Sequence, residues 1–491
     1  MFKQIASNTL SQVGSKFATA LISIFLLSIL TNYLSLEMYG LYGKVYNYVG
    51  LFVFLADLGL YTIAIREITN QKDQSEKIVG NVMTLRGILG IIIIFLAVGI
   101  AYFLPGYNSD TALWAIFIAS LFTLFQLFNS SIMALMQANM KMEFSFFSTV
   151  AGKLLNIGVV LGIVFIWYTK DTLVSYHISF LGIIFASLLG VLLNTGLNFW
   201  YGNKIVPIRF YYDRTYIWDL FKTSLPYGIA LFLSIVYFKV DVILLSLLEG
   251  PGTGDISIAL YSLPMKIVEV VMIMGGFYLN SILPFLSEYF AEKKTLLLQA
   301  MFSHSLQLLF GAGVGIAVLG ILFREHMVRV IANEQYLVPV QGFDSGDVFV
   351  IVLFVVVFYF ASLLFIYLLI AAKKQSQLLK INIFVTLINI IGNIYLIPHF
   401  SFMGAAVVTL LSQICLLVLC YFAVSRIHVF TFPTQSLFVS LILGGTIWYT
   451  GYFFLNTYSL GLYGDVFVYG SIFTLLYFGF WYLLNRKTIS F

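Results

Sequence analysis

Ionisable side chains deep inside long apolar stretches are the residues of this sequence most able to do chemistry, because such placement is costly and usually serves a function. Ten residues are of this kind, and seven are basic: Lys16, Lys44, Asp57, Arg86, Lys153, Lys222, Lys239, Asp241, Lys266 and Glu269. Lys and Arg bind phosphate groups by charge and by hydrogen bonds. Cations that face one shared cavity therefore predict a site for an anion, above all a phosphate or pyrophosphate.

Structural explanations compete with this prediction. A lysine or arginine near a helix end can reach the lipid headgroups with its long side chain, which would account for Lys222, Lys153 and Arg86. The same explanation suits Lys239 poorly, because eight residues separate it from the end of its apolar stretch.

The acidic members of the set have open roles. Glu269 follows Lys266 by three residues, so the two share one helix face and could form an internal ion pair. Asp57 lies near the middle of its stretch and could bond to a neighbouring helix. Asp57, Asp241, Glu269 and the nearby His304 are all possible groups for coupling transport to an ion gradient, with none preferred.

Several enzyme signatures are missing from the sequence. It has no G-x-x-x-x-G-K-[ST] phosphate-binding loop, and its five histidines form no close metal-ligand pair. No connecting loop is long enough for a transferase or ligase site. We therefore expect no enzyme activity, no cofactor and no metal.

The elements that position these charges must be membrane helices. Of 491 residues, 61% are hydrophobic and 10% are charged, whereas soluble domains are ~45–50% apolar and ~25% charged. This excludes a soluble enzyme, a nucleic-acid-binding protein and a disordered chain. The apolar stretches are long and continuous, which predicts an all-α polytopic membrane protein rather than a barrel.

About fourteen spans are predicted. Their limits are 10–33, 43–66, 80–104, 111–137, 146–168, 175–200, 219–247, 256–287, 298–323, 346–371, 377–398, 402–424, 434–455 and 465–484. With a cytoplasmic N-terminus, the cytoplasmic segments hold fifteen Lys and Arg and the outer loops three. The positive-inside rule then places both termini in the cytoplasm.

The first twelve spans resemble two sets of six. Leu41-Tyr42 and Leu260-Tyr261 each follow an acidic, glycine-containing turn and precede a lysine, Lys44 or Lys266. Six spans is an even number, so the halves would have the same orientation, with a substrate site between them. We expect an N-lobe at 1–205, a C-lobe at 206–428 and two extra helices at 429–491.

The order of several motifs resembles the polysaccharide-transporter family. The matching stretches are a polar-headed first helix from Asn8, then Glu37-Met38-Tyr39-Gly40 and Leu55-Ala56-Asp57-Leu58-Gly59-Leu60, then Ser224-Leu225-Pro226 and Ile282-Leu283-Pro284, and finally Asn389 to Thr409 with Ile397-Pro398 and Gly404-Ala405-Ala406. The resemblance covers essentially the whole chain.

This family contains the O-antigen and lipid-linked oligosaccharide flippases of the multidrug/oligosaccharidyl-lipid/polysaccharide exporter superfamily. The resemblance implies two six-helix lobes related by a pseudo-two-fold axis, two extra C-terminal helices and a cytoplasmic membrane of a bacterium or archaeon. It implies translocation of undecaprenyl-pyrophosphate-linked glycan to the outer leaflet, for example in lipopolysaccharide biosynthesis. Glycan polymerase and glycosyltransferases would be possible partners. The family's cationic cavity maps onto Lys16, Lys44, Lys239 and Lys266.

Two transport alternatives remain. The first is a cation-coupled multidrug antiporter of the same superfamily. Such antiporters resemble one another in having an acidic residue in the first lobe. The first span here contains no Asp or Glu, which argues against this alternative. A lipid II flippase would use its last two helices to form a lipid groove, and the spans at 434–455 and 465–484 give no polar sign of one.

Overall fold

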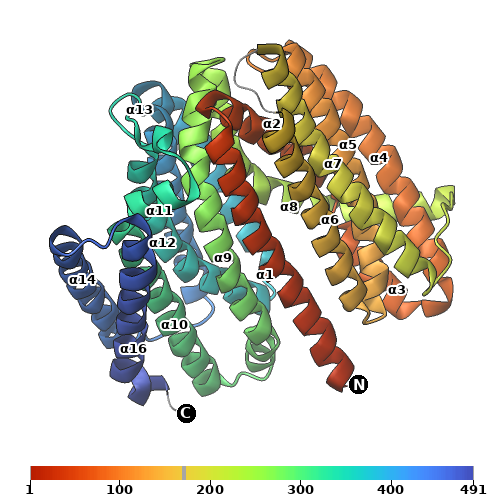
Figure 1. The fold of residues 1–491 in the computed structure, drawn as a ribbon. Helices are drawn as coiled ribbons and strands as arrows, with labels where there is room; N and C mark the ends of the chain where they lie inside the picture. The colour runs from red at the N-terminus through yellow and green to blue at the C-terminus, as the bar shows by residue number, and fades with distance from the viewer. Residues whose placement is uncertain (1, 168–172, 490–491) are drawn as a thin grey trace. The chain divides into compact units, whose positions relative to one another are not determined.

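The computed structural model describes residues 2–167 and 173–489, and in these residues every regular element is a helix (Figure 1). The prediction of an all-α membrane protein is confirmed. Eleven described helical segments are long and apolar enough to cross a membrane, judged by length and composition. A helix occupies each of the fourteen predicted spans.

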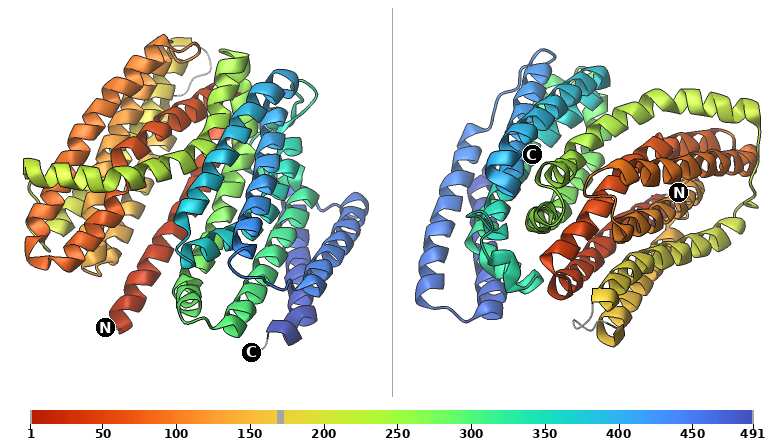
Figure 2. Two further views of the ribbon diagram at one scale, coloured as in Figure 1. Left: turned by 180° about the vertical axis from the view of Figure 1, so that it is seen from behind. Right: turned by 90° about the horizontal axis from the view of Figure 1, so that it is seen from above.

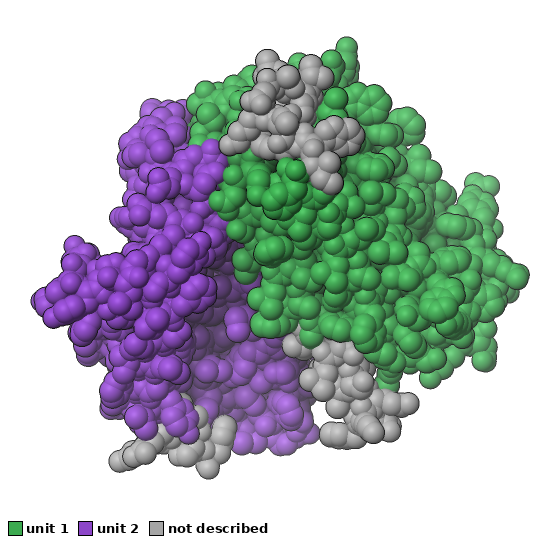
Figure 3. Space-filling view, viewed as in Figure 1, with its two compact units in different colours: residues 1–256 green, residues 257–491 purple. Residues whose placement is uncertain are grey.

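The chain forms two compact units, residues 1–256 and residues 257–491 (Figure 3). The helices that lie in unit 1 are α1 (Phe2–Tyr33), α2 (Leu36–Asp57), α3 (Leu60–Asn70), α4 (Ser75–Phe103), α5 (Asp110–Ala138), α6 (Met142–Gly162), α7 (Leu173–Asn203) and α8 (Arg214–Glu249), with short turns η1 (Lys72–Gln74) and η2 (Ile163–Trp167). The next helix, α9 (Thr253–Ala291), begins in unit 1 and continues into unit 2.

Unit 2 contains the rest of α9 and the helices that follow it. These are α10 (Thr295–Leu322), α11 (Arg324–Ile331), α12 (Ser345–Ala371), α13 (Gln375–Ser425), α14 (Thr434–Thr457), α15 (Leu462–Gly464) and α16 (Gly470–Ile489), with η3 (Glu334–Leu337) and η4 (Asp465–Tyr469). The unit boundary lies one helix beyond the expected lobe boundary at 205, because α8 packs on α2 and α4. The lobes are defined by sequence repetition and stay a prediction.

The second predicted span, 43–66, had the wrong limits. The structure has α2 ending at Asp57 and α3 beginning at Leu60, and both intervening residues have left-handed backbone, with φ of 46° at Leu58 and 70° at Gly59. A left-handed residue cannot continue a right-handed helix. The interruption therefore places Asp57 at a helix end.

A second interruption separates two predicted spans that the structure joins in α13. Ser401 has φ 51° and ψ −138° inside this helix, and it lies between the predicted spans 377–398 and 402–424. By contrast, α9 is continuous through Pro264 and Pro284. The side chain of Pro226, which belongs to the Ser224-Leu225-Pro226 motif on α8, lies outside the described residues.

Within unit 2, α14 and α16 pack against each other and against α10 (Figures 1 and 2). Trp481 lies directly against Gly311, where a Cβ atom would be 2.4 Å from the indole nitrogen. The Tyr477 hydroxyl donates to the Gly311 carbonyl at 2.9 Å, and the Trp481 indole donates to Ser440 at 3.0 Å. Because Gly311 has no side chain, the aromatic side chains of α16 can pack directly on the backbone of α10 at this position.

Candidate functional site

Lys44 is buried and has partners from two other segments of unit 1. It lies eight residues into α2, about 12 Å from the helix start, and its side chain is 1% exposed. Its Nζ is 2.6 Å from the Asp255 carboxylate and donates to the Gly106 carbonyl at 2.7 Å. The Tyr107 ring lies beside the same ammonium, 5.3 Å from Nζ to ring centroid. Lys44 is therefore neutralised inside its own unit.

Close backbone approach explains how Asp255 reaches Lys44. A Cβ on Gly40 would lie 1.7 Å from the Asp255 carbonyl oxygen, so only glycine lets α2 and the first turn of α9 come this near. Gly106, Gly250 and Gly252 have φ of 81°, 78° and 80° in the turns around this contact. These turns bring a carbonyl and a carboxylate to one buried ammonium.

Asp255 is the partner that the sequence prediction missed. It belongs to the acidic, glycine-containing turn before Leu260-Tyr261, so its residue type and position were visible in the sequence. Its contact with Lys44 was not visible, because the two residues are more than two hundred positions apart. A place for Lys44 in the cationic cavity that the family resemblance implied does not fit this burial.

Arg86 and Asp57 form a second internal ion pair in unit 1. The Arg86 guanidinium donates to the Asp57 carboxylate, to Ser131 Oγ at 2.7 Å and to the Leu127 carbonyl at 3.2 Å. Arg86 is 0% exposed and Asp57 is 23% exposed. The explanation of Arg86 as a side chain reaching the headgroups is therefore wrong, and Asp57 makes the bond to a neighbouring helix that the sequence left as one of its possible roles.

The break between α2 and α3 lies next to this pair. On α8, a Cβ at Gly228 would be 2.7 Å from the Leu58 Cα, so α8 passes against the backbone of the break. The left-handed residues are thus held from one side by a glycine of α8, while Asp57, the neighbour of Leu58, is bonded to Arg86 of α4. Asp57 thus fixes the end of α2 to α4 at the point where the helix is interrupted.

Lys239 and Asp241 lie on the second half of α8, and both are described as part of unit 1. The Lys239 Cε is 4.0 Å from where a Gly50 Cβ would be, so its aliphatic chain runs along α2. Lys239 is half-buried and Asp241 is buried, at 2% exposure. The side chain of Lys239 therefore contacts α2 at Gly50.

Lys266 and Glu269 lie on α9 in unit 2 and pair along their own helix. Their Nζ–Oε2 distance is 2.7 Å, and both side chains are 43% exposed. Lys266 is thirteen residues from the start of α9, about 20 Å along the helix. The i,i+3 pair that the sequence left open as an alternative is present, and both side chains remain partly exposed.

The remaining predicted cations lie on separate helices. Lys16 is exposed on α1, and Lys153 is half-buried on α6. Lys222 is exposed near the start of α8, with its Nζ 5.2 Å from the centre of the Trp218 ring. The structure joins none of these three to the Lys44 or Arg86 pair by a described contact.

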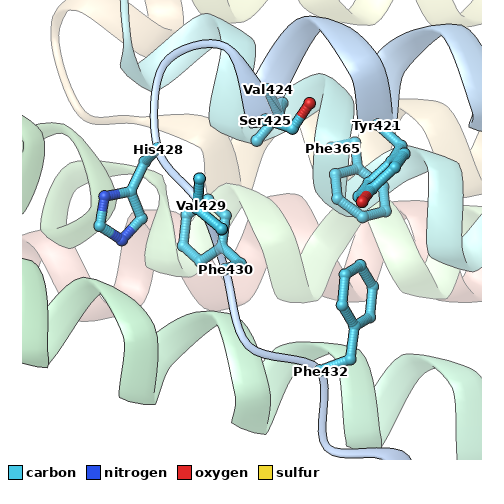
Figure 4. A pocket seen from close by; sticks show the side chains of 8 residues that line it. All are labelled: Phe365, Tyr421, Val424, Ser425, His428, Val429, Phe430 and Phe432. Carbon is cyan, nitrogen blue, oxygen red and sulfur yellow. The ribbon is translucent and has the colours of Figure 1, made fainter.

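A small aromatic pocket lies elsewhere in unit 2, where α12, α13 and the segment after α13 meet (Figure 4). Its lining residues are Phe365, Tyr421, Val424, Ser425, His428, Val429, Phe430 and Phe432. The segment after α13 is fixed to α10, because Gln299 exchanges two hydrogen bonds with the backbone of Thr431, at 2.8 and 3.0 Å. The pocket contains none of the predicted site residues.

In the described residues, no group of three or more His, Cys, Asp or Glu side chains is arranged to hold a metal ion. Some of the predicted site residues lie in two buried pairs, Lys44–Asp255 and Arg86–Asp57. Lys16 and Lys266 are accessible cations, and Lys239 has an intermediate exposure. The accessible cations can bind an anion by charge and hydrogen bonds.

Comparison with known families identifies the chain. A family model described as "Polysaccharide biosynthesis protein" matches residues 5–290, more than half of the sequence. The chain belongs to this family. The MatE family model matches residues 226–395, and no curated protein matches the sequence. The family expected from the order of the motifs is confirmed.

Solved structures of membrane transporters share the fold. A lipid II flippase MurJ in an inward closed conformation is 14% identical, with a TM-score of 0.75, and the match covers 99% of this chain and 100% of that one. An inward-facing multidrug resistance MATE family transporter of the MOP superfamily is 15% identical, with a TM-score of 0.66 over 82% of this chain and 95% of that one. The MATE multidrug transporter DinF-BH is 16% identical, with a TM-score of 0.62 over 86% and 95%.

Proposed function

We propose that this chain is a flippase that moves undecaprenyl-pyrophosphate-linked oligosaccharide from the cytoplasmic to the outer leaflet. The observation that carries the proposal is the match of residues 5–290 to the polysaccharide biosynthesis family, in a chain with the fold of membrane flippases and transporters. The transported glycan would be an O-antigen unit or another polysaccharide repeat unit. Glycosyltransferases would supply this lipid-linked glycan, and a polymerase would use it after translocation.

The accessible cations are the residues that we assign to the pyrophosphate. Lys266 is half-exposed deep along α9, Lys16 is exposed on α1, Lys239 is half-buried on α8, and the family resemblance selects all three. Glu269 holds Lys266 in this structure, so a pyrophosphate would have to replace this carboxylate. Lys44 becomes a structural residue in this proposal, because Asp255 and Gly106 already satisfy it.

The remaining architecture is proposed on the sequence pattern. It consists of an N-lobe at 1–205, a C-lobe at 206–428 and extra helices at 429–491, with both termini cytoplasmic in the cell membrane. Transport would follow alternating access, in which the two lobes rock against each other. Asp57, Asp241 and Glu269 stay open as coupling groups, and the bond from Asp57 to Arg86 favours a structural role for the first.

The test is delivery of glycan to the cell surface, with protein level measured in the same cells. If a point charge holds the pyrophosphate, Lys266→Arg should keep most delivery and Lys266→Ala should lose most of it. A hydrogen bond to a charged group is worth about 1.5–3 kcal/mol, so its loss should weaken binding roughly ten- to a hundredfold. Lys374→Ala is the matched control, because this exposed cation at the start of α13 is not assigned to the pyrophosphate and should be dispensable.

The double variant Lys266→Ala/Glu269→Gln separates binding from folding. It removes both charges, so it strands neither one, and it should be stable but inactive. Normal delivery by the double variant would refute the substrate role of Lys266. Rescue of cells that lack their lipid II flippase, or drug resistance without glycan delivery, would instead support one of the two alternative transport functions.

A further inference from the structure

The connection between α7 and α8 is fixed to unit 1 along its length. The Ile208 amide donates to Asn203 Oδ1 at 2.7 Å, and Ile208 is buried in the core of the unit. The Tyr211 hydroxyl donates to Glu76 at 2.8 Å, and the Asp213 amide donates to Asn81 Oδ1 at 2.8 Å. Residues 204–213 therefore form a packed strap whose outward side chains have set positions.

The outward side chains of this strap and its flanking helices are aromatic and basic. Exposed fractions are 54% for Trp200, 63% for Phe210, 68% for Tyr212 and 55% for Trp218. Aromatic side chains with this exposure would be unfavourable in water but are favoured where hydrocarbon meets headgroups. Phe210 and Tyr212 belong to the packed strap, and Trp200 and Trp218 lie on the helices that flank it.

Lysines cover the two tryptophans of this surface. Lys204 Nζ lies 3.3 Å from the centre of the Trp200 ring, and Lys222 Nζ lies 5.2 Å from the centre of the Trp218 ring. Such a pair puts an apolar ring and a cation at one position, with the ring able to enter the interface and the cation able to meet a phosphate.

The depth of the surface follows from the helices that bound it. The segment His177–Asn203 is long and apolar enough to cross a membrane, and it ends where the strap begins. Trp200 is three residues before that end, and Trp218 is four residues after the start of α8. Each tryptophan is thus within about one helical turn, or about 5 Å, of a helix terminus. Trp200 therefore lies near the end of a candidate membrane span, where headgroups are expected.

The charge balance of the surface is positive. The segment 200–222 contains four cations, Lys204, Arg209, Arg214 and Lys222, and two carboxylates, Asp213 and Asp219. Asp213 is occupied as the N-cap of α8: it accepts from the Thr215 hydroxyl at 2.7 Å and from the amides of Thr215 and Tyr216 at 3.1 Å each. The hydrogen bond from Thr215 also lowers the pKa of Asp213, so this carboxylate stays ionised and engaged with the helix.

We propose that this strap surface, formed by Trp200, Lys204, Arg209, Tyr212, Trp218 and Lys222, binds the headgroups of anionic phospholipids. Each cation near an anionic surface favours binding, whereas a zwitterionic headgroup offers no net charge to it. The surface is independent of the transported substrate, because its residues differ from those assigned to pyrophosphate. It would fix the first turn of α8 to lipid.

The test uses the full-length protein in nanodiscs and the fluorescence of its own tryptophans. Zwitterionic phosphatidylcholine is mixed with a fixed share of acyl-brominated lipid, which is either phosphatidylglycerol or phosphatidylcholine. The expected result is stronger quenching by the brominated phosphatidylglycerol. The variant Lys204→Gln/Arg209→Gln/Lys222→Gln should reduce this preference at least about fivefold, since one cation near an anionic surface is worth about that factor.

Two further variants make the result decisive. Lys373→Gln/Lys374→Gln/Arg426→Gln removes three exposed cations elsewhere and should keep the preference. Trp200→Phe/Trp218→Phe keeps every charge and should remove the preferential part of the signal, even if the triple variant folds poorly. Equal quenching by the two brominated lipids in the unaltered protein would overturn the proposal, and so would a preference that survives loss of both tryptophans.

Discussion

The lysines of α2 and α9 occupy comparable places in the sequence but have different surroundings. Lys44 is 1% exposed, and its partners are a carboxylate and a carbonyl from segments far away in the chain. Lys266 is 43% exposed, and its partner Glu269 is three residues away on the same helix. Both lysines follow an acidic turn and a Leu-Tyr pair, so the sequence pattern assigns them one role.

The difference separates a buried, fully paired lysine from a half-exposed lysine inside a long helix. Lys44 has lost its water, so its charge is tolerable only while Asp255 is present. Lys266 keeps access on one side, and an exposed i,i+3 pair contributes little to stability. Burial together with the origin of the partner therefore assigns the first to folding and leaves the second available for a ligand.

The largest expected effect is the loss of Lys44. Lys44→Met should strand the Asp255 carboxylate and destabilise the protein by about 3–5 kcal/mol, the usual cost of breaking a buried pair. Thermal unfolding of the purified protein in detergent measures this. Lys44→Met/Asp255→Asn should recover most of the stability, because no charge is then left buried without a partner. A single variant as stable as the unaltered protein would remove the distinction between the two lysines.

A smaller loss is expected from filling the close approach that supports the pair. Gly40→Ala would put a Cβ 1.7 Å from the Asp255 carbonyl oxygen and push the start of α9 away from α2. Overpacking of this kind costs about 1–3 kcal/mol. Gly50→Ala is the matched control on the same helix, because its Cβ would meet only Lys239 Cε, at 4.0 Å. If both variants unfold at the same temperature, close backbone approach does not maintain the Lys44 contact.

The smallest effect on stability belongs to Lys266. Lys266→Gln should change the free energy of unfolding by less than about 0.5 kcal/mol, because the pair is half-exposed and lies within one helix. Glycan delivery should nevertheless fall. If Lys266→Gln unfolds at a temperature as low as that of Lys44→Met, Lys266 is a structural residue and the contrast between the two lysines does not hold.

The fold class and the family were predictable from the sequence because both depend on patterns that are local or ordered along the chain. Apolar stretches of about twenty residues must form helices in a bilayer, where no water satisfies the backbone. The Lys266–Glu269 pair was predictable for the same reason, since helix geometry alone puts these two side chains on one face. The interruption after Asp57 was missed, because a left-handed Leu-Gly pair has no apolar signature.

The amino-acid sequence by itself determined that the protein is helical, that it belongs in a membrane and that it carries an excess of cations inside its spans. Only the tertiary structure decided which of these cations are satisfied. Asp255 reaches Lys44, and Arg86 reaches Asp57, through contacts between helices that are distant in sequence. Such contacts depend on how closely two backbones approach, which at Gly40 is set by a missing side chain. The distance between helices is a property of the packed unit, and no single segment of the sequence contains it.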